Sequence, residues 1–72
     1  MDIQHLEELG EHLRSLGHRR RELVERILSE VDEGDRASSK NLYQELSQIS
    51  EDAIFLMQKQ KSMIDEEISK LQ

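Results

Sequence analysis

The chain has 72 residues, of which 36% are charged and 35% hydrophobic, and its formal net charge is −6. This length allows at most one domain with a small core, and the absence of cysteine excludes disulfides and thiolate metal sites. A net negative charge disfavours nucleic acid as a partner, because phosphate binding needs a cationic surface.

The sequence shows no pattern of a membrane or export segment. Its longest apolar run, residues 53–57, is far shorter than a transmembrane span or a signal-peptide core. We therefore expect a soluble, cytoplasmic protein that does not insert into membranes, and, because the chain begins with Met1, a complete small gene product.

Residues 3–32 predict one long helix. Apolar residues recur there at steps of three, four and seven, the heptad spacing of a helix that packs along one face. Arg20 interrupts this hydrophobic seam at one position, and Val24, Leu28 and Val31 widen it towards the end of the helix. The seam consists of Ile3, Leu6, Leu9, Leu13, Leu16, Leu23 and Ile27.

Residues 33–35 predict a tight turn. Gly34 can adopt the left-handed conformation that ends a helix. Asp35 can accept hydrogen bonds from the free N–H groups of the next helix, and Ser38 or Ser39 is an alternative cap one turn later. A connection this short folds the second helix back on the first.

Residues 36–70 predict the second helix. Its seam is Leu42, Leu46, Ile49, Ala53, Leu56 and Met63, with Gln60 at a polar position, and a neighbouring row takes over at Met57, Ile64, Ile68 and Leu71. At 1.5 Å per residue each helix would be roughly 45–52 Å long. The sequence therefore predicts an all-α fold over residues 1–72, an antiparallel, coiled-coil-like hairpin of two helices.

No residue pattern indicates catalysis, a metal site or a cofactor. His5 and His12 are about 10 Å apart on a helix, too far for one metal ion to bridge. The carboxylate runs, such as residues 65–67, contain no calcium loop, and phosphate-binding glycine loops and nucleophile motifs are missing. We expect no enzyme, no cofactor and no small-molecule substrate, although the histidines could tune a pH-dependent interface.

Two glycines stand in a local repeat, His5-Leu6-x-x-Leu9-Gly10 followed by His12-Leu13-x-x-Leu16-Gly17. A glycine inside a helix costs about 0.8–1 kcal/mol relative to alanine. Two of them beside the seam suggest that another helix approaches closely. That neighbour is either the second helix of the same hairpin or another molecule, and a frayed N-terminal end is a further explanation.

The apolar run 53–57 covers more than a full helical turn, whereas one partner helix covers about a third of the circumference. Some of Ile54, Phe55 and Met57 should therefore face away from the first helix and form an exposed patch of the kind that marks interfaces. The predicted partner-binding residues are Gly10, Gly17, Ile49, Ala53, Ile54, Phe55, Leu56, Met57, Met63 and Ile64.

A hairpin of this size has little core, and domains of about 70 residues rarely gain more than about 3–5 kcal/mol from one core. We therefore expect a further helical layer, supplied by another helical protein or by a second copy. The main hypothesis is a chaperone-like or adaptor module that covers a helical segment of a partner. The alternative is a homodimeric four-helix bundle with a structural or regulatory role.

Residues 23–57 resemble the YscE-like co-chaperones of bacterial type III secretion. The similarity consists of a heptad helix, the turn at Gly34-Asp35, Tyr43-Gln44 and the run Leu46, Ile49, Ala53, Ile54. It implies that the apolar face of the second helix binds a helical-repeat co-chaperone, and that together they keep a needle subunit from polymerising too early.

A slighter resemblance, to Spo0E-like phosphatases, is a remote alternative. Residues 43–47 read Tyr-Gln-Glu-Leu-Ser where that family has Ser-Gln-Glu-Leu-Asp. The Asp on which the chemistry would rest is missing, so this sequence does not support the activity.

Overall fold

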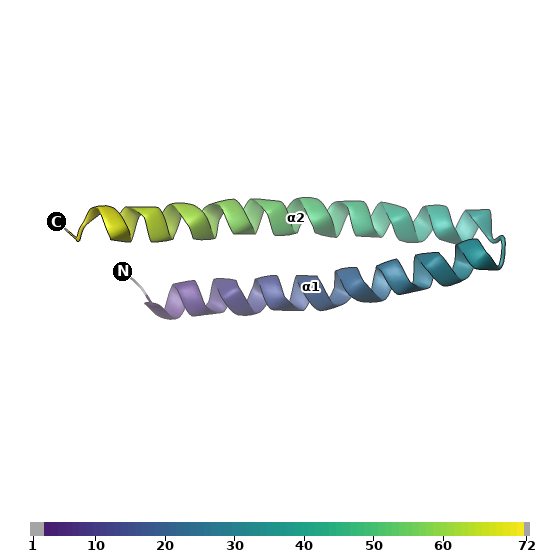
Figure 1. Ribbon diagram of the computed structural model, residues 1–72, viewed down its shortest axis with the longest axis horizontal. Coiled ribbons are helices and arrows are strands. Elements are labelled where there is room, and N and C mark those ends of the chain that lie inside the picture. Colours follow the sequence, from purple (N-terminus) through teal and green to yellow (C-terminus); the bar gives the residue numbers. More distant parts are fainter. Residues whose placement is uncertain (1–2, 72) are drawn as a thin grey trace.

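The computed structural model describes residues 3–71 and consists of two antiparallel helices, α1 (Ile3–Asp32) and α2 (Arg36–Ser69). The helices lie side by side along their length, and both ends of the chain lie at the same end of the hairpin (Figure 1). The described residues contain no strand. The predicted all-α hairpin is confirmed, and the predicted helix ends agree with the observed ones to within about a residue.

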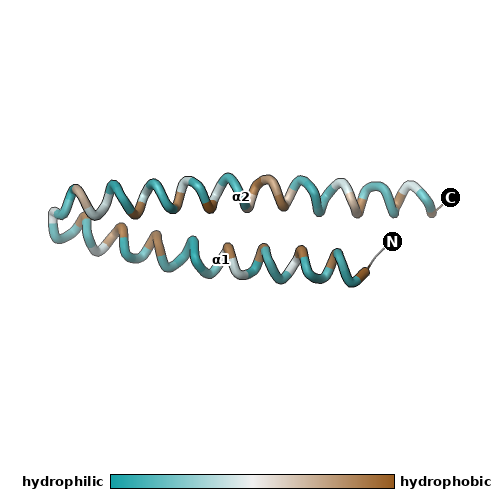
Figure 2. Tube along the Cα trace, turned by 180° about the vertical axis from the view of Figure 1, so that it is seen from behind, coloured by the Kyte–Doolittle hydropathy of each residue, from teal (hydrophilic) through white to brown (hydrophobic). Residues whose placement is uncertain are grey.

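The two helices pack along the seams that the heptad spacing predicts. Leu9 and Leu23 of α1 and Ala53 of α2 are buried between them. In Figure 2 the hydrophobic positions lie mainly on the sides of the helices that face each other. The molecule is 57 Å long but only 15 and 13 Å across, so it is a rod one helix layer thick. Within residues 3–71, neither helix contains an apolar stretch that could cross a bilayer.

The turn is held by hydrogen bonds that satisfy the free backbone groups of both helix ends. Gly34 has a φ of 77°, its N–H donates to the Val31 carbonyl at 3.0 Å, and the Asp35 N–H donates to the Glu30 carbonyl at 2.9 Å. This is the Schellman arrangement that ends a helix at a left-handed glycine. The predicted role of Gly34 is therefore confirmed.

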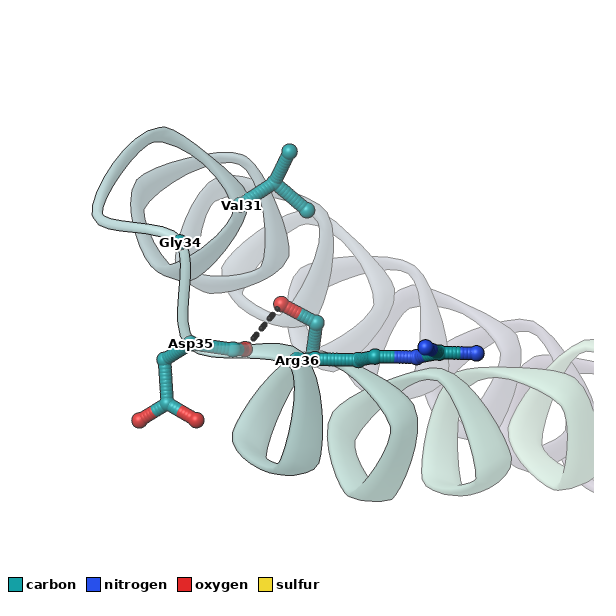
Figure 3. Close-up of a pocket in the computed structure, with 5 residues that line it drawn as sticks. Val31, Gly34, Asp35 and Arg36 are labelled. Atoms are coloured by element: carbon teal, nitrogen blue, oxygen red, sulfur yellow. Dashed lines mark hydrogen bonds between the residues drawn. The ribbon is translucent and has the colours of Figure 1, made fainter.

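Asp35 caps the start of α2. Its carboxylate accepts from the Ser38 N–H at 3.0 Å, and its carbonyl accepts from the Ser39 hydroxyl at 2.7 Å, the dashed bond in Figure 3. The hydrogen bond from the Ser38 N–H is the main cause that lowers the pKa of Asp35. The cap is therefore Asp35, as predicted, and not the alternative caps Ser38 or Ser39.

Candidate protein-interaction surface

The contact between α1 and α2 buries only a small part of the apolar side chains. Among the described residues, Leu23 alone is completely buried, at 0% exposure. Eleven large hydrophobic side chains are at least 40% exposed: Ile3, Val24, Leu28, Val31, Tyr43, Ile54, Phe55, Met57, Ile64, Ile68 and Leu71. The hairpin alone therefore leaves most of its bulky apolar surface in water.

The heptad register shows where these exposed side chains lie. The seam positions a and d are occupied by Leu6 and Leu9 in α1 and by Leu46 and Leu42 in α2. In this register each e position lies beside the seam, and each b position lies next to an e position on the outer side. The e positions hold Ile3, Gly10, Gly17, Val24 and Val31, and then Arg36, Tyr43, Ser50, Met57, Ile64 and Leu71. The b positions include Leu28, Ile54 and Ile68.

Ten of the eleven exposed hydrophobic side chains therefore belong to the e and b rows. We call the surface formed by these rows of both helices the apolar flank. The exception is Phe55, which occupies a c position and lies on the opposite flank. Such a large one-sided apolar surface is typical of a binding face, since scattered exposed residues would be spread over both flanks.

The two e rows lie on the same side of the hairpin. A hollow of about 370 Å³ at mid-length is lined by Gly10, Leu13, Gly17 and Arg20 from α1 and by Ala53, Met57 and Gln60 from α2. Beside it, a second hollow includes Arg21 and Val24. The apolar flank is thus a shallow groove between two helices.

The groove extends towards both ends of the molecule. Near the turn, a hollow is lined by Val31, Gly34, Asp35, Arg36 and Ser39 (Figure 3). At the open end, another is lined by Leu6, Ile64, Glu67, Ile68 and Leu71. The hollows on the apolar flank therefore follow almost the whole length of the hairpin.

The opposite edge of the seam is polar. Its g positions hold His5, His12, Arg19 and Arg26 in α1 and Glu45, Asp52, Lys59 and Glu66 in α2. Arg19 forms ion pairs with Glu45 across the helices and with Glu22 one turn along α1. The hydrogen bond to Glu45 is the main cause that raises the pKa of Arg19. An ion pair thus links the helices on this edge, whereas the other edge is mainly apolar and its cross-helix polar contact is the Arg20–Ser50 hydrogen bond.

The glycine repeat lies within the apolar flank, and α2 does not approach it closely. A Cβ built at Gly10 or at Gly17 has no atom of the molecule within 4 Å, apart from its own chain neighbours and helix backbone. Packing of the hairpin's own second helix therefore does not explain these glycines. The helix is continuous from Ile3 through both positions.

The structure divides the predicted partner-binding residues into three groups. Ala53 is buried, and Ile49, Leu56 and Met63 are half-buried at seam positions against α1. Ile54, Met57 and Ile64 lie exposed on the apolar flank together with the two glycines, whereas Phe55 lies on the other side. The half-buried seam residues pack against α1 and expose less surface than the residues of the apolar flank, so their role in partner binding stays a prediction.

Apart from Gly10 and Gly17, the predicted set left out the residues that α1 contributes to this surface. Ile3, Val24, Leu28 and Val31 form its apolar positions, and Tyr43, Ile68 and Leu71 extend the α2 side. The signal in the sequence was an e row of α1 without any charged residue. It becomes informative only when it is placed beside the e row of α2.

The side chains of the described residues form no cluster that could hold a metal ion. No group of three or more histidine and carboxylate side chains within residues 3–71 converges on one point. Buried polar side chains are also missing from that part of the chain. No protein-family model matches the chain, and searches among curated proteins and solved structures find no significant match.

Proposed function

We propose that this protein is a protein-interaction module that binds a helical segment of a partner along its apolar flank. The observation that carries the proposal is the position of ten exposed hydrophobic side chains on one flank of a two-helix rod. A third helix laid in the groove would bury them and complete a three-helix bundle. Helix-in-groove recognition uses apolar anchors of this kind, spaced along the partner at helical intervals.

The length of the apolar flank suits a helical partner. The hairpin is 57 Å long, so a partner helix of about 38 residues, at 1.5 Å per residue, would span the flank from end to end. The small core of the hairpin supports the same proposal, because a bound helix adds stability to a fold that has little of its own.

Two neighbouring residues offer a matched test. Ile54 and Phe55 are 51% and 65% exposed, but Ile54 lies on the apolar flank and Phe55 on the opposite one. A photo-reactive phenylalanine analogue placed at either position should cross-link a partner from position 54 and not from position 55. Ile54→Asp should likewise weaken association much more than Phe55→Asp, while both variants keep the helical circular dichroism of the parent.

Equal cross-linking from both positions would show that binding does not use the apolar flank. A chain that stays a stable monomer at high concentration and cross-links to nothing would contradict the proposed function itself.

The alternative is a homodimer in which two apolar flanks form a four-helix bundle. Both functions would cover the same ten side chains, so variants of these residues do not distinguish them. The mass of the cross-linked product and the dependence of molecular mass on protein concentration do distinguish them. The co-chaperone role implied by the resemblance to YscE-like proteins is a special case of the main proposal, in which the partner is a helical-repeat protein.

A further inference from the structure

The charges around the apolar flank are opposite in sign to those of the whole chain. Among the described residues, its e and b rows carry five bases, Arg14, Arg21, Arg36, Lys40 and Lys61, and a single acid, Glu7. All six side chains are exposed. The full chain, in contrast, has 16 acids and 10 bases. The e and b rows are therefore cationic, whereas the rest of the surface is acidic. Three of the acids outside these rows, Glu25, Asp35 and Glu67, line hollows of the flank.

The bases lie at the borders of the groove. Arg14 and Arg21 occupy successive b positions on the outer side of α1, and Lys40 and Lys61 occupy b positions on the outer side of α2. An apolar strip thus runs between two cationic borders. In the middle, the Arg20 side chain reaches from the seam to the α2 side of the groove, where its Nε donates to the Ser50 hydroxyl at 2.9 Å.

The five flank bases form no ion pair with another described residue, although acids are abundant in the chain. Outside the flank, Arg19 pairs with Glu22 and Glu45, and Lys70 pairs with Glu67. Arg26 and Lys59 also lack an ion pair with a described residue, so it is the concentration of such bases on the flank that sets this surface apart. An exposed cation that no neighbouring acid of its own chain neutralises is free to interact with an acid of a bound molecule.

We propose that the apolar flank binds an acidic amphipathic helix of another protein, in which Asp or Glu residues border an apolar stripe. This inference rests on the proposed function and names the chemical class of the partner. A partner helix of about 30 residues would be about 45 Å long and would follow most of the groove. Its apolar side chains would enter the hollows beside Gly10 and Gly17, and its acids would meet the two cationic borders.

The same charges disfavour a second copy as the occupant. A twofold axis brings the same rows of two molecules together, and both outer borders of this flank are basic. Five of the six charged side chains on these rows are basic, with Glu7 as the single acid, so most contacts between charged groups of two copies would join bases to bases. Like charges across an interface suppress such pairing.

An anionic lipid surface also attracts bases, but it fits the shape and the remaining charge less well. The flank is a hollowed groove between two helices, whereas a membrane-surface helix presents a convex apolar face. Among the described residues, every acid except Glu7 lies outside the e and b rows. An anionic membrane would repel those acids that come within a screening length of about 8–10 Å of it.

The test uses the full 72-residue chain and two synthetic helices. Both carry the same leucine and isoleucine stripe, one bordered by glutamates and the other by lysines. Titration followed by fluorescence anisotropy should give at least a roughly tenfold lower Kd for the glutamate peptide at low salt, and this ratio should shrink at high salt.

Lys61 and Lys59 provide the matched variants. Lys61 lies on the apolar flank and Lys59 at a g position on the opposite edge, and both are exposed. Lys61→Glu, alone or combined with Arg21→Glu, should raise the Kd of the glutamate peptide several-fold and favour the lysine peptide. Lys59→Glu should leave both affinities nearly unchanged.

Each other outcome overturns the inference in a distinct way. Equal binding of both peptides, abolished by Ile54→Asp, would keep the proposed function and reject the acidic partner. Failure of both peptides to bind, with a flank-dependent dimer in sedimentation equilibrium, would assign the flank to a second copy. Binding to phosphatidylserine vesicles that Ile54→Asp abolishes, with no binding of either peptide, would assign it to lipid.

Discussion

Replacing Leu23 by alanine should come close to unfolding the hairpin. Leu23 is the one described side chain with no exposed surface, and Leu9 and Ala53 are the other buried hydrophobic residues among those described. Truncation of a buried leucine typically costs about 2–5 kcal/mol. A domain of this size has about 3–5 kcal/mol in total, so this one substitution removes most of the free energy of unfolding.

Urea titration followed by circular dichroism at 222 nm measures the effect. With an m value of about 1 kcal/mol/M, a loss of about 2 kcal/mol moves the midpoint down by about 2 M. Leu28→Ala is the matched control, because Leu28 lies in the same helix but is 65% exposed. Its substitution should change stability by less than about 0.5 kcal/mol.

Equal losses of stability in Leu23→Ala and Leu28→Ala in dilute solution would contradict this prediction. That result would mean that contacts in the seam do not determine the stability of the hairpin. A large loss for Leu28→Ala that grows with protein concentration would have a different meaning. It would show that self-association through the apolar flank stabilises the fold.

Three further predictions concern the helix ends and the polar edge. Gly10→Ala should raise the free energy of unfolding by about 0.8–1 kcal/mol, because the added Cβ meets open space on a helix. Gly34→Ala should lower the free energy of unfolding, because the backbone φ of 77° there favours glycine, and thermal melts of both variants test this pair. The pKa of Asp35 is lowered in the folded state, so its capping contribution to stability should be fully present above the unfolded pKa of about 3.9. This contribution should be lost as the pH falls through the lowered folded-state value, so the melting temperatures of wild type and Asp35→Ala should converge in acid. A double-mutant cycle on Arg19 and Glu45 should give a small coupling that vanishes in high salt, since both side chains are at least 40% exposed; a coupling that salt does not reduce would contradict this assignment.

The two helices and their connection could be predicted from sequence because the forces that form them are local. Heptad spacing places the seam of each helix without knowledge of its partner. A glycine followed by an aspartate ends one helix and caps the next through groups within a few residues. The structure adds the hydrogen bonds of Gly34 and Asp35 but does not change their roles.

The candidate surface depended on tertiary structure. The sequence alone singled out the run 53–57, yet the structure buries Ala53, places Ile54 and Met57 on one flank and puts Phe55 on the other. Ile54 and Phe55 lie on different flanks because neighbouring residues on a helix point about 100° apart, and the face of α2 that packs against α1 lies between these flanks.

The full extent of the apolar flank emerges only when both helices are aligned. Val24 of α1 and Met57 of α2 are far apart in sequence, and each alone resembles an ordinary edge of an amphipathic helix. Antiparallel packing brings their rows to the same side, while the pair Arg19–Glu45 closes the other side. Local sequence therefore determined which residues are helical, and the register between the helices decided which of them form a surface.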